Sequence, residues 1–91
     1  MTNRIYVGNT TSDDITVIDG SDNETATVAA GSAPYAVDVN PRTNKIYVAN
    51  SDGNSVTVID GTNNSTATVA AGTTPSAIAV NPNTNKIYVA N

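Results

Sequence analysis

The chain is 91 residues long and carries four basic against eight acidic residues, a net charge of −4 that argues against a nucleic-acid partner. It has no cysteine and no histidine, which excludes disulfides, thiolate metal sites and histidine-based acid–base catalysis. No apolar run approaches the roughly 18 residues that span a bilayer, so we expect no membrane insertion.

One segment, residues 44–50, recurs almost unchanged at residues 3–9 and 85–91. The three copies are equally spaced, and we call this spacing one repeat length. The chain therefore comprises a first repeat (3–43), a second repeat (44–84) and a third copy of the opening strand (85–91). A chain of this length buries only about 60–65 % of its unfolded surface, so each repeat depends on its neighbours for a core. We therefore interpret the whole chain as a single repeat unit.

Each repeat is predicted to form four short strands, and the second repeat shows the pattern clearly. Large apolar residues alternate through residues 45–49 and 55–59, the period of two that predicts strands. Residues 66–70 are mostly threonine and alanine, which indicates an outer edge strand. Residues 76–80 are small and almost continuously apolar, as in a strand crowded on both faces. Gly, Asn, Asp and Pro separate these runs, so we predict an all-β fold without helices, whose glycines, asparagines and aspartates supply the positive φ angles of the turns.

Four strands in a repeat of about 40–50 residues are typical of a β-propeller blade, and they fit a blade better than the uniform coils of a β-solenoid. The run Ile-Tyr-Val-Ala-Asn at residues 46–50, with Val-Thr-Val-Ile-Asp at 56–60 and Ala-Val-Asn-Pro at 79–82, resembles the YVTN repeat. The resemblance extends over residues 3–91, although the usual threonine is replaced by glycine or alanine. It implies a β-propeller of the surface-layer type and an extracellular or cell-surface location, although the chain shows no signal peptide.

In such a blade the strand at 76–80 is innermost, and the strands at 45–49, 55–59 and 66–70 follow outward. The chain then supplies two four-stranded antiparallel blades, each one repeat in length, plus one duplicated strand. Of these, only residues 34–70 form a blade from contiguous chain. Two blades cannot close a ring, so an isolated chain is expected to expose apolar residues on both blade faces. These residues are Ile46, Val48, Val56, Val58 and their equivalents.

The duplicated strand predicts where one chain meets the next. The strands at both ends of the chain are near-copies that compete for one position beside residues 14–19 and 25–29 of a neighbouring chain. Their central residues, predicted to take part in this exchange between chains, are Ile5, Tyr6, Val7, Ile87, Tyr88 and Val89. The leading hypothesis is a structural or interaction module that assembles head-to-tail with copies of itself, by strand exchange, into a ring or a fibre. Its predicted partner is therefore the chain itself.

The alternative hypothesis is a ligand-binding β-propeller for a glycan, peptide or small molecule. Its channel mouth would include Tyr35 and Asp38, which stand where the second repeat has Ser76 and Ala79. If Asp38 points into a central channel, a ring of such carboxylates is a weak candidate for Ca²⁺, and no other metal or cofactor is expected. The plainer interpretation is a solvated carboxylate and an exposed tyrosine.

Several polar residues recur with the repeat. Four asparagines begin an Asn-x-Ser/Thr sequon in predicted loops and are candidates for glycosylation: Asn9, Asn23, Asn63 and Asn64. Tyr6, Tyr47 and Tyr88 are expected to pack between blades with their hydroxyl groups hydrogen-bonded. The oxygen-rich loops after Asp19 and Asp60 are interpreted as turns rather than metal sites. No Ser–His or Cys–His pair and no helix-borne phosphate loop are possible, so we expect no enzyme.

Overall fold

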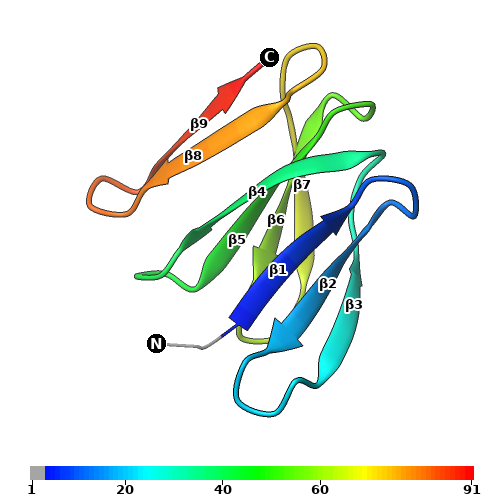
Figure 1. Ribbon diagram of the computed structural model, residues 1–91. Helices are drawn as coiled ribbons and strands as arrows, with labels where there is room; N and C mark the ends of the chain where they lie inside the picture. The colour runs from blue at the N-terminus through cyan, green and yellow to red at the C-terminus, as the bar shows by residue number, and fades with distance from the viewer. Residues whose placement is uncertain (1–3) are drawn as a thin grey trace.

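A computed structural model of the protein describes residues 4–91 and contains nine strands (Figure 1). The strands are β1 (Arg4–Asn9), β2 (Asp14–Asp19), β3 (Thr25–Ala29), β4 (Pro34–Asn40), β5 (Lys45–Asn50), β6 (Ser55–Asp60), β7 (Thr66–Ala70), β8 (Ala77–Asn81) and β9 (Lys86–Ala90). Over these residues there is no helix, and so none that is long and apolar enough to cross a membrane. The predicted all-β fold is confirmed.

The nine strands form three antiparallel sheets. The first sheet contains β1, β2 and β3, the second β4 to β7, and the third β8 and β9, each in chain order. Only the second sheet has four strands, and it comes from the contiguous chain that the repeat spacing predicted. Within residues 4–91 the strands of the two repeats therefore do not make two four-stranded sheets, since the first sheet has three strands and the third has two.

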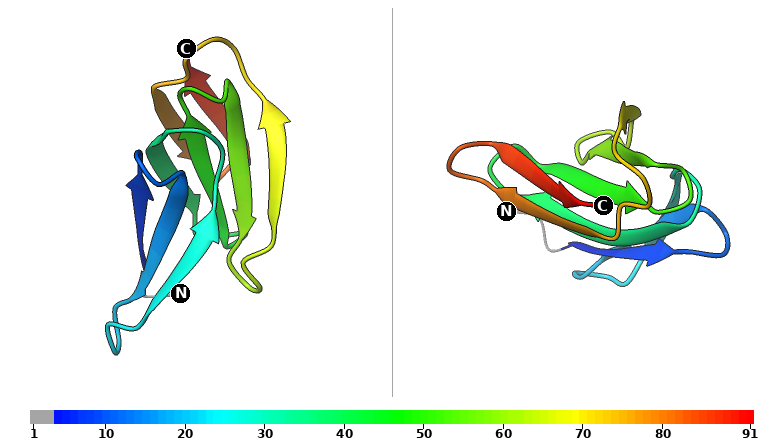
Figure 2. Two further views of the ribbon diagram at one scale, coloured as in Figure 1. Left: turned by 90° about the vertical axis from the view of Figure 1, so that its right-hand side faces the viewer. Right: turned by 90° about the horizontal axis from the view of Figure 1, so that it is seen from above.

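The second sheet lies between the other two. Its first strand, β4, packs beside β1 on one side and beside β8 on the other, and β5 also contacts β8. Figure 2 shows the sheets following one another face to face in chain order. Each sheet thus packs on the sheet of the neighbouring repeat, as expected for a repeat protein.

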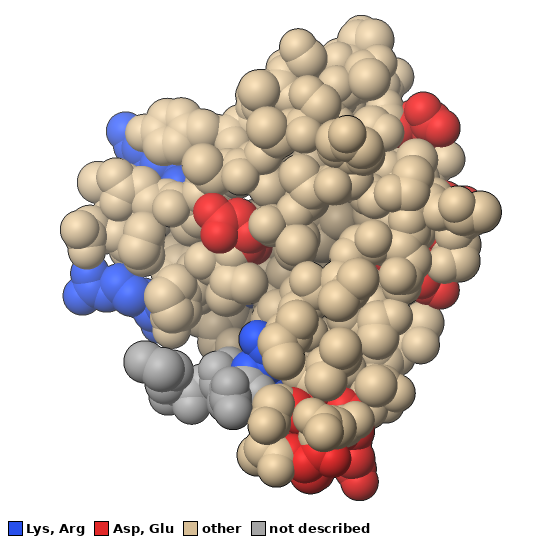
Figure 3. All heavy atoms as spheres, in the orientation of Figure 1, with Lys and Arg blue, Asp and Glu red and all other residues tan. Residues whose placement is uncertain are grey.

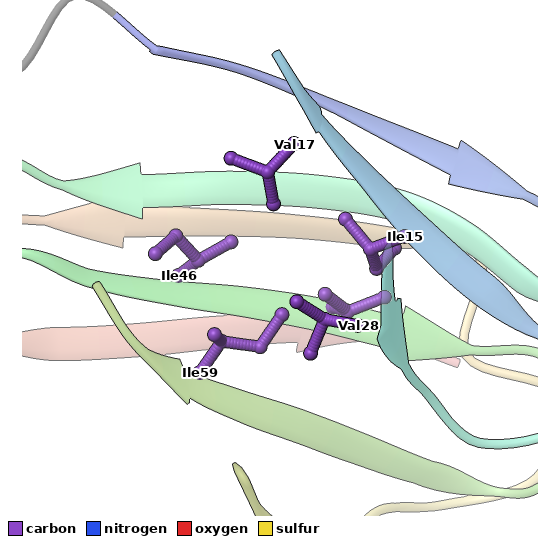
Figure 4. Close-up of a cluster of buried hydrophobic side chains, with 6 residues drawn as sticks. Ile15, Val17, Val28, Ile46 and Ile59 are labelled. Carbon is purple, nitrogen blue, oxygen red and sulfur yellow. The ribbon is translucent and has the colours of Figure 1, made fainter. Parts of the chain in front are cut away.

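The hydrophobic core lies between the first and second sheets. It contains Ile15, Val17 and Val28 from the first sheet and Ile46, Val48 and Ile59 from the second. Their side chains point toward one another across the two sheets (Figure 4). The prediction that an isolated chain exposes Ile46, Val48 and Val56 is therefore wrong, since the sheets on either side bury all three; Val58 is half-buried.

The turns use positive φ angles, but the described glycines do not supply them. The residues with positive φ are Asp13, Asn23, Ala33, Asn44, Asn54, Asn64, Thr74 and Asn85. Asparagine and aspartate tolerate this conformation because their side chains bond locally to the backbone. The expectation for glycine was wrong because glycine is needed here for close approach. At Gly31, a Cβ atom would lie 2.6 Å from Nδ2 of Asn50.

Two of the positive φ angles belong to residues that rarely adopt them. Ala33 and Thr74 are equivalent residues of the two repeats, and each precedes a buried proline at the crossover to a new sheet. The backbone N–H of Ala33 donates to Oδ1 of Asp13, and that of Thr74 donates to Oδ1 of Asn54, both at 2.9 Å. These hydrogen bonds hold a conformation that a β-branched residue otherwise avoids.

Candidate functional site

Each sheet presents two apolar faces, which we name by the residues of its Ile-Tyr-Val strand. The tyrosine face of the first sheet carries Tyr6 and, opposite it in the strand register, Val17; the isoleucine face carries Ile5 and Ile18. The equivalent residues of the second repeat define the two faces of the second sheet. In the core, the tyrosine face of the first sheet packs on the isoleucine face of the second.

This first contact between sheets is closed. Ile59 on β6 is fully buried with Ile15 and Val28, and Val28 on the outer strand β3 is only 6 % exposed. The closure depends on β6, because β6 carries Ile59 across the outer half of the contact. The isoleucine face therefore needs its third strand in order to cover the tyrosine face of the preceding sheet.

The second contact uses the same two faces but remains open. The tyrosine face of the second sheet meets Ile87 and Val89 of the third sheet across a cavity of about 350 Å³. Val56, Val58 and Val69 line the opposite wall, and Val69 is 54 % exposed where its equivalent, Val28, is 6 % exposed. The cavity exists because the third sheet has no strand that corresponds to β6, so no side chain takes the place of Ile59.

The isoleucine face of the first sheet is also uncovered. Ile5 is 49 % exposed and Val7 is 40 % exposed, whereas their equivalents Ile46 and Val48 are fully buried. In the same strand, one edge of β1 pairs with β2, and the other edge has no strand partner within residues 4–91. Residues 4–91 therefore leave two apolar surfaces open. One is the cavity between the second and third sheets, and the other is the isoleucine face of the first sheet.

Four of the six predicted exchange residues lie on these surfaces, and the two tyrosines do not. Ile5 and Val7 belong to the open isoleucine face, and Ile87 and Val89 line the cavity. Tyr6 points inward and packs against the core, but its buried hydroxyl has no hydrogen-bond partner, contrary to our expectation. Tyr88 is 58 % exposed, because β9 has no sheet beyond it on that side.

Asp38 does not present a free carboxylate. Its Oδ1 accepts the backbone N–H of Val39, and its Oδ2 accepts that of Val80 on β8, both at 2.9 Å. The side chain thus joins the second sheet to the third. Within residues 4–91, no group of three or more acidic side chains is placed to hold a metal ion, and a Ca²⁺ site made by Asp38 carboxylates of several copies stays a prediction.

The surroundings of Tyr35 differ from those of Asp38, because Tyr35 is largely exposed to solvent. It is 66 % exposed and stands at an irregularity in the β4–β5 register, where Pro34 pairs with Asn50 and the next pair begins at Ala36. The ligand-binding alternative therefore has one exposed aromatic ring, together with a half-buried carboxylate whose oxygens each accept one backbone hydrogen bond.

The four sequons differ in their surroundings. The side-chain amide of Asn9 donates to Oδ1 of Asp14 at 2.9 Å and to Oγ1 of Thr16 at 2.8 Å, so this residue is a poor glycosylation candidate. Asn23, Asn63 and Asn64 are exposed in turns.

A buried polar cluster at the end of β5 was not anticipated. Asn50 is fully buried and its amide donates to Ser55 and Thr57, while Gly31 from the preceding crossover lies against its side chain. Asn91 contacts Gly72 in the same way. A sequence signal existed, since the asparagine and glycine both recur at the repeat spacing, but it does not distinguish burial from a surface turn.

Acidic side chains gather at the β2–β3 end of the first sheet, at the foot of the view in Figure 3. Here Asp19 Oδ1 accepts the backbone N–H and the hydroxyl of Ser21, and these bonds hold the pKa of Asp19 below its ordinary value. Asp60 is bonded in the same way by Thr62, which lowers its pKa, with a smaller contribution from the charge of Lys45. The interpretation of these loops as turns therefore agrees with their hydrogen bonds.

These depressed pKa values predict a small acid sensitivity. An aspartate whose pKa is lower in the folded than in the unfolded chain stabilises the fold above its ordinary pKa of 3.8, and the effect disappears as the pH falls through the folded value. We expect Asp60→Asn to lower stability slightly at neutral pH and to reduce the further loss below pH 3.8. Urea unfolding at several pH values measures this, and a parallel offset at every pH would contradict it.

Comparison with known proteins adds a fold relative. No protein-family model matches the sequence, and no curated protein matches it. Among solved structures, the chain is similar to the crystal structure of a functionally unknown protein from Desulfotomaculum acetoxidans, with a TM-score of 0.82 at 21 % sequence identity. The match covers 99 % of this chain and 32 % of that protein, so this chain spans about a third of its length. At this identity the likeness shows the fold alone.

Proposed function

We propose that the protein is a structural or interaction module that assembles head-to-tail with copies of itself. The observation that carries this proposal is that two equivalent apolar walls, one in each repeat, differ in whether another sheet covers them. The first wall is closed where Val28 faces β6, and the second is open where its equivalent, Val69, faces the cavity. The open isoleucine face of the first sheet of a second copy has the composition that closes the wall in the first contact.

The free energy of this association comes from apolar burial. Fully burying an aliphatic side chain is worth about 1.5–3 kcal/mol relative to leaving it exposed. Ile5, Val7 and Val69 are each 40–54 % exposed, so their burial together offsets part of the cost of ordering two chains. Since the surfaces at the two sides differ, the contact is heterologous and either closes as a ring or continues as a fibre.

The architecture that we propose for this assembly is a β-propeller of YVTN-like blades. Three consecutive sheets that use the same two faces, each displaced by one repeat length along the chain, support it. The third sheet of one copy and the first sheet of the next would together form one blade, so each copy adds two blades, and three or four copies form a ring. A solved protein about three times as long shares this arrangement over a third of its chain, which is the proportion expected if more sheets complete it. A place in a cell-surface or extracellular layer belongs to the same proposal.

Sedimentation equilibrium at micromolar concentrations tests the proposal. We expect a mass above the 9.3 kDa of one chain that rises with concentration to a plateau for a ring or without limit for a fibre. Val69→Asp should abolish assembly, because it places a charge in the wall that the neighbour covers. Tyr35→Asp is the matched control, since it also adds a charge at an exposed apolar residue but lies outside the open faces. A 9.3 kDa species at every concentration would contradict the proposal.

A further inference from the structure

A head-to-tail assembly has one strand too many for a four-stranded sheet. Both β9 of one copy and β1 of the next copy could fill the position between β8 of the first copy and β2 of the second. We propose that β9 is a placeholder: on assembly it leaves β8, and β1 of the next copy takes its place while remaining in its own first sheet. This inference rests on the proposed function and adds to it the identity of the strand that moves.

The backbone hydrogen bonds do not decide between the two strands. In the β8–β9 register, Ile78 is opposite Val89 and Val80 is opposite Ile87. Because β1 and β9 share Ile-Tyr-Val at equivalent positions, β1 takes the same register, with Ile78 opposite Val7 and Val80 opposite Ile5. A β8–β1 ladder would replace a β8–β9 ladder of equal length. Which strand pairs with β8 therefore depends on the other contacts that hold β1 and β9.

β1 is held by the second sheet as well as by β2. Nη1 of Arg4 donates to the carbonyl oxygen of Gly61 at 3.0 Å, and Oγ1 of Thr10, just beyond β1, donates to that of Pro34 at 2.9 Å. The ring of Tyr6 packs against the core and its hydroxyl is buried. Removing β1 would break these bonds and open the core from one side.

β9 has weaker attachments. Its residues are alternately exposed and half-buried, and Tyr88, the equivalent of Tyr6, is 58 % exposed. Hydrogen bonds join this hairpin to the second sheet through β8, where Val80 donates to Asp38, and through its turn, where Asn85 accepts from Asn40 and Asn83 accepts from Arg42. Displacing β9 therefore costs less side-chain burial than displacing β1.

The exchange also fills the cavity. If β1 of the next copy pairs with β8, then β2 of that copy follows in the third position of the sheet. Ile18 on β2 is the first-repeat equivalent of Ile59, the residue that closes the first contact between sheets. Ile18 then lies against Val69, as Ile59 lies with Val28, and the isoleucine face with Ile5 and Val7 becomes covered.

Disulfide trapping in the 91-residue protein tests which strand occupies the position. Residues directly opposite in an antiparallel pair lie about 4.5–5.5 Å apart between Cα atoms, within disulfide reach. The protein has no cysteine of its own, so every disulfide reports the introduced pair. The double variant Val7→Cys with Ile78→Cys should form disulfides between copies under mild oxidation, because β1 pairs with β8. The double variant Thr16→Cys with Val89→Cys should form none, because β9 is displaced from the position beside β2.

The outcomes separate the two proposals. Disulfides between copies in the Thr16→Cys, Val89→Cys variant and none in the other would overturn the placeholder role of β9 but keep the head-to-tail assembly. An assembled protein that forms neither disulfide would overturn strand exchange altogether. A protein that sediments as a single chain and forms neither disulfide would overturn the proposed function, and the inference with it.

A matched pair of single substitutions gives a second, independent readout. Ile5 and Ile87 occupy the same position in the two competing strands. We expect Ile87→Asp to weaken β9 as a competitor and to lower the midpoint concentration of assembly, and Ile5→Asp to raise it by about tenfold or more. Circular dichroism of each variant checks that the sheets remain folded. Shifts in the opposite directions would show that β9 stays and β1 leaves.

Discussion

Replacement of Ile46 by alanine is expected to reduce the free energy of unfolding by about 2–5 kcal/mol, the range for a large aliphatic side chain removed from a closed core. Ile46 is fully buried between the first and second sheets, where Ile15, Val17 and Ile59 surround it. The same substitution at Ile5, which is 49 % exposed, should cost less than about 1 kcal/mol. Urea unfolding followed by circular dichroism measures both values.

The comparison is informative because the two isoleucines occupy equivalent positions in similar sequences and differ in what covers them. Dilute protein is required, since assembly would bury Ile5 and raise the cost of its removal. A growing cost of Ile5→Ala with protein concentration is therefore a further expected result. Equal costs at Ile5 and Ile46 in dilute protein would contradict the assignment of an open and a closed face.

Gly61→Ala is expected to destabilise the fold by about 1–3 kcal/mol through overpacking. Gly61 is buried at the turn after β6, and a Cβ atom there would lie 2.7 Å from the backbone oxygen of Asn44. That oxygen cannot move away easily, because it accepts the backbone N–H of Gly61 at 2.8 Å. The φ angle of Gly61 is not positive, so the cost comes from lack of space and not from backbone strain.

Gly8→Ala is the matched control for Gly61→Ala. An added Cβ at residue 8 would be no closer than 3.4 Å to any atom, and alanine favours a strand over glycine by about 0.5–1 kcal/mol. The control should therefore leave stability within about 1 kcal/mol of the original value. Thermal or urea unfolding of the two variants side by side measures the difference. Similar losses in both would show that glycine is needed for its flexibility at either position.

The strands themselves could be predicted from the sequence to within a single position at their ends. The predicted strand at residues 45–49 extends to Asn50, and the one at 76–80 is β8 (Ala77–Asn81). Local physics is sufficient here, because β-branched residues with a period of two favour strands and Asn, Asp, Gly and Pro interrupt them. The repeat spacing also predicted correctly that residues 34–70 alone make a four-stranded sheet.

The burial of individual faces could not be predicted in this way. Period two shows which residues share a face, but both faces of these sheets are apolar, so the pattern does not show which face is covered. Coverage depends on a sheet that lies one repeat length away along the chain. For that reason Ile46 and Val48 proved buried, whereas Ile5 and Val7 remained exposed in a closely similar local sequence.

The burial and hydrogen-bond partners of two polar residues could not be predicted from the sequence either. Asp38 and Asn50 look like surface or channel residues in the sequence, because a carboxylate or an amide is usually solvated. Instead, Asp38 accepts the backbone N–H of Val80 on the next sheet, and Asn50 is buried against Ser55 and Thr57. The partner of Asp38 lies on another sheet, whereas the partners of Asn50 lie on the next strand of its own sheet and only its burial depends on the neighbouring segments.

The sequence by itself determined the repeat length, the strand types and their order, because these depend on neighbouring residues along the chain. It also determined that the last strand, β9, is a near-copy of β1. Only the tertiary structure decided that one apolar wall is closed while its equivalent in the second repeat is open, and that Arg4 on β1 is hydrogen-bonded to the second sheet. The physical reason is that burial and hydrogen bonds between sheets join residues far apart in the chain. A local sequence pattern therefore does not show which of two similar surfaces is covered by another sheet.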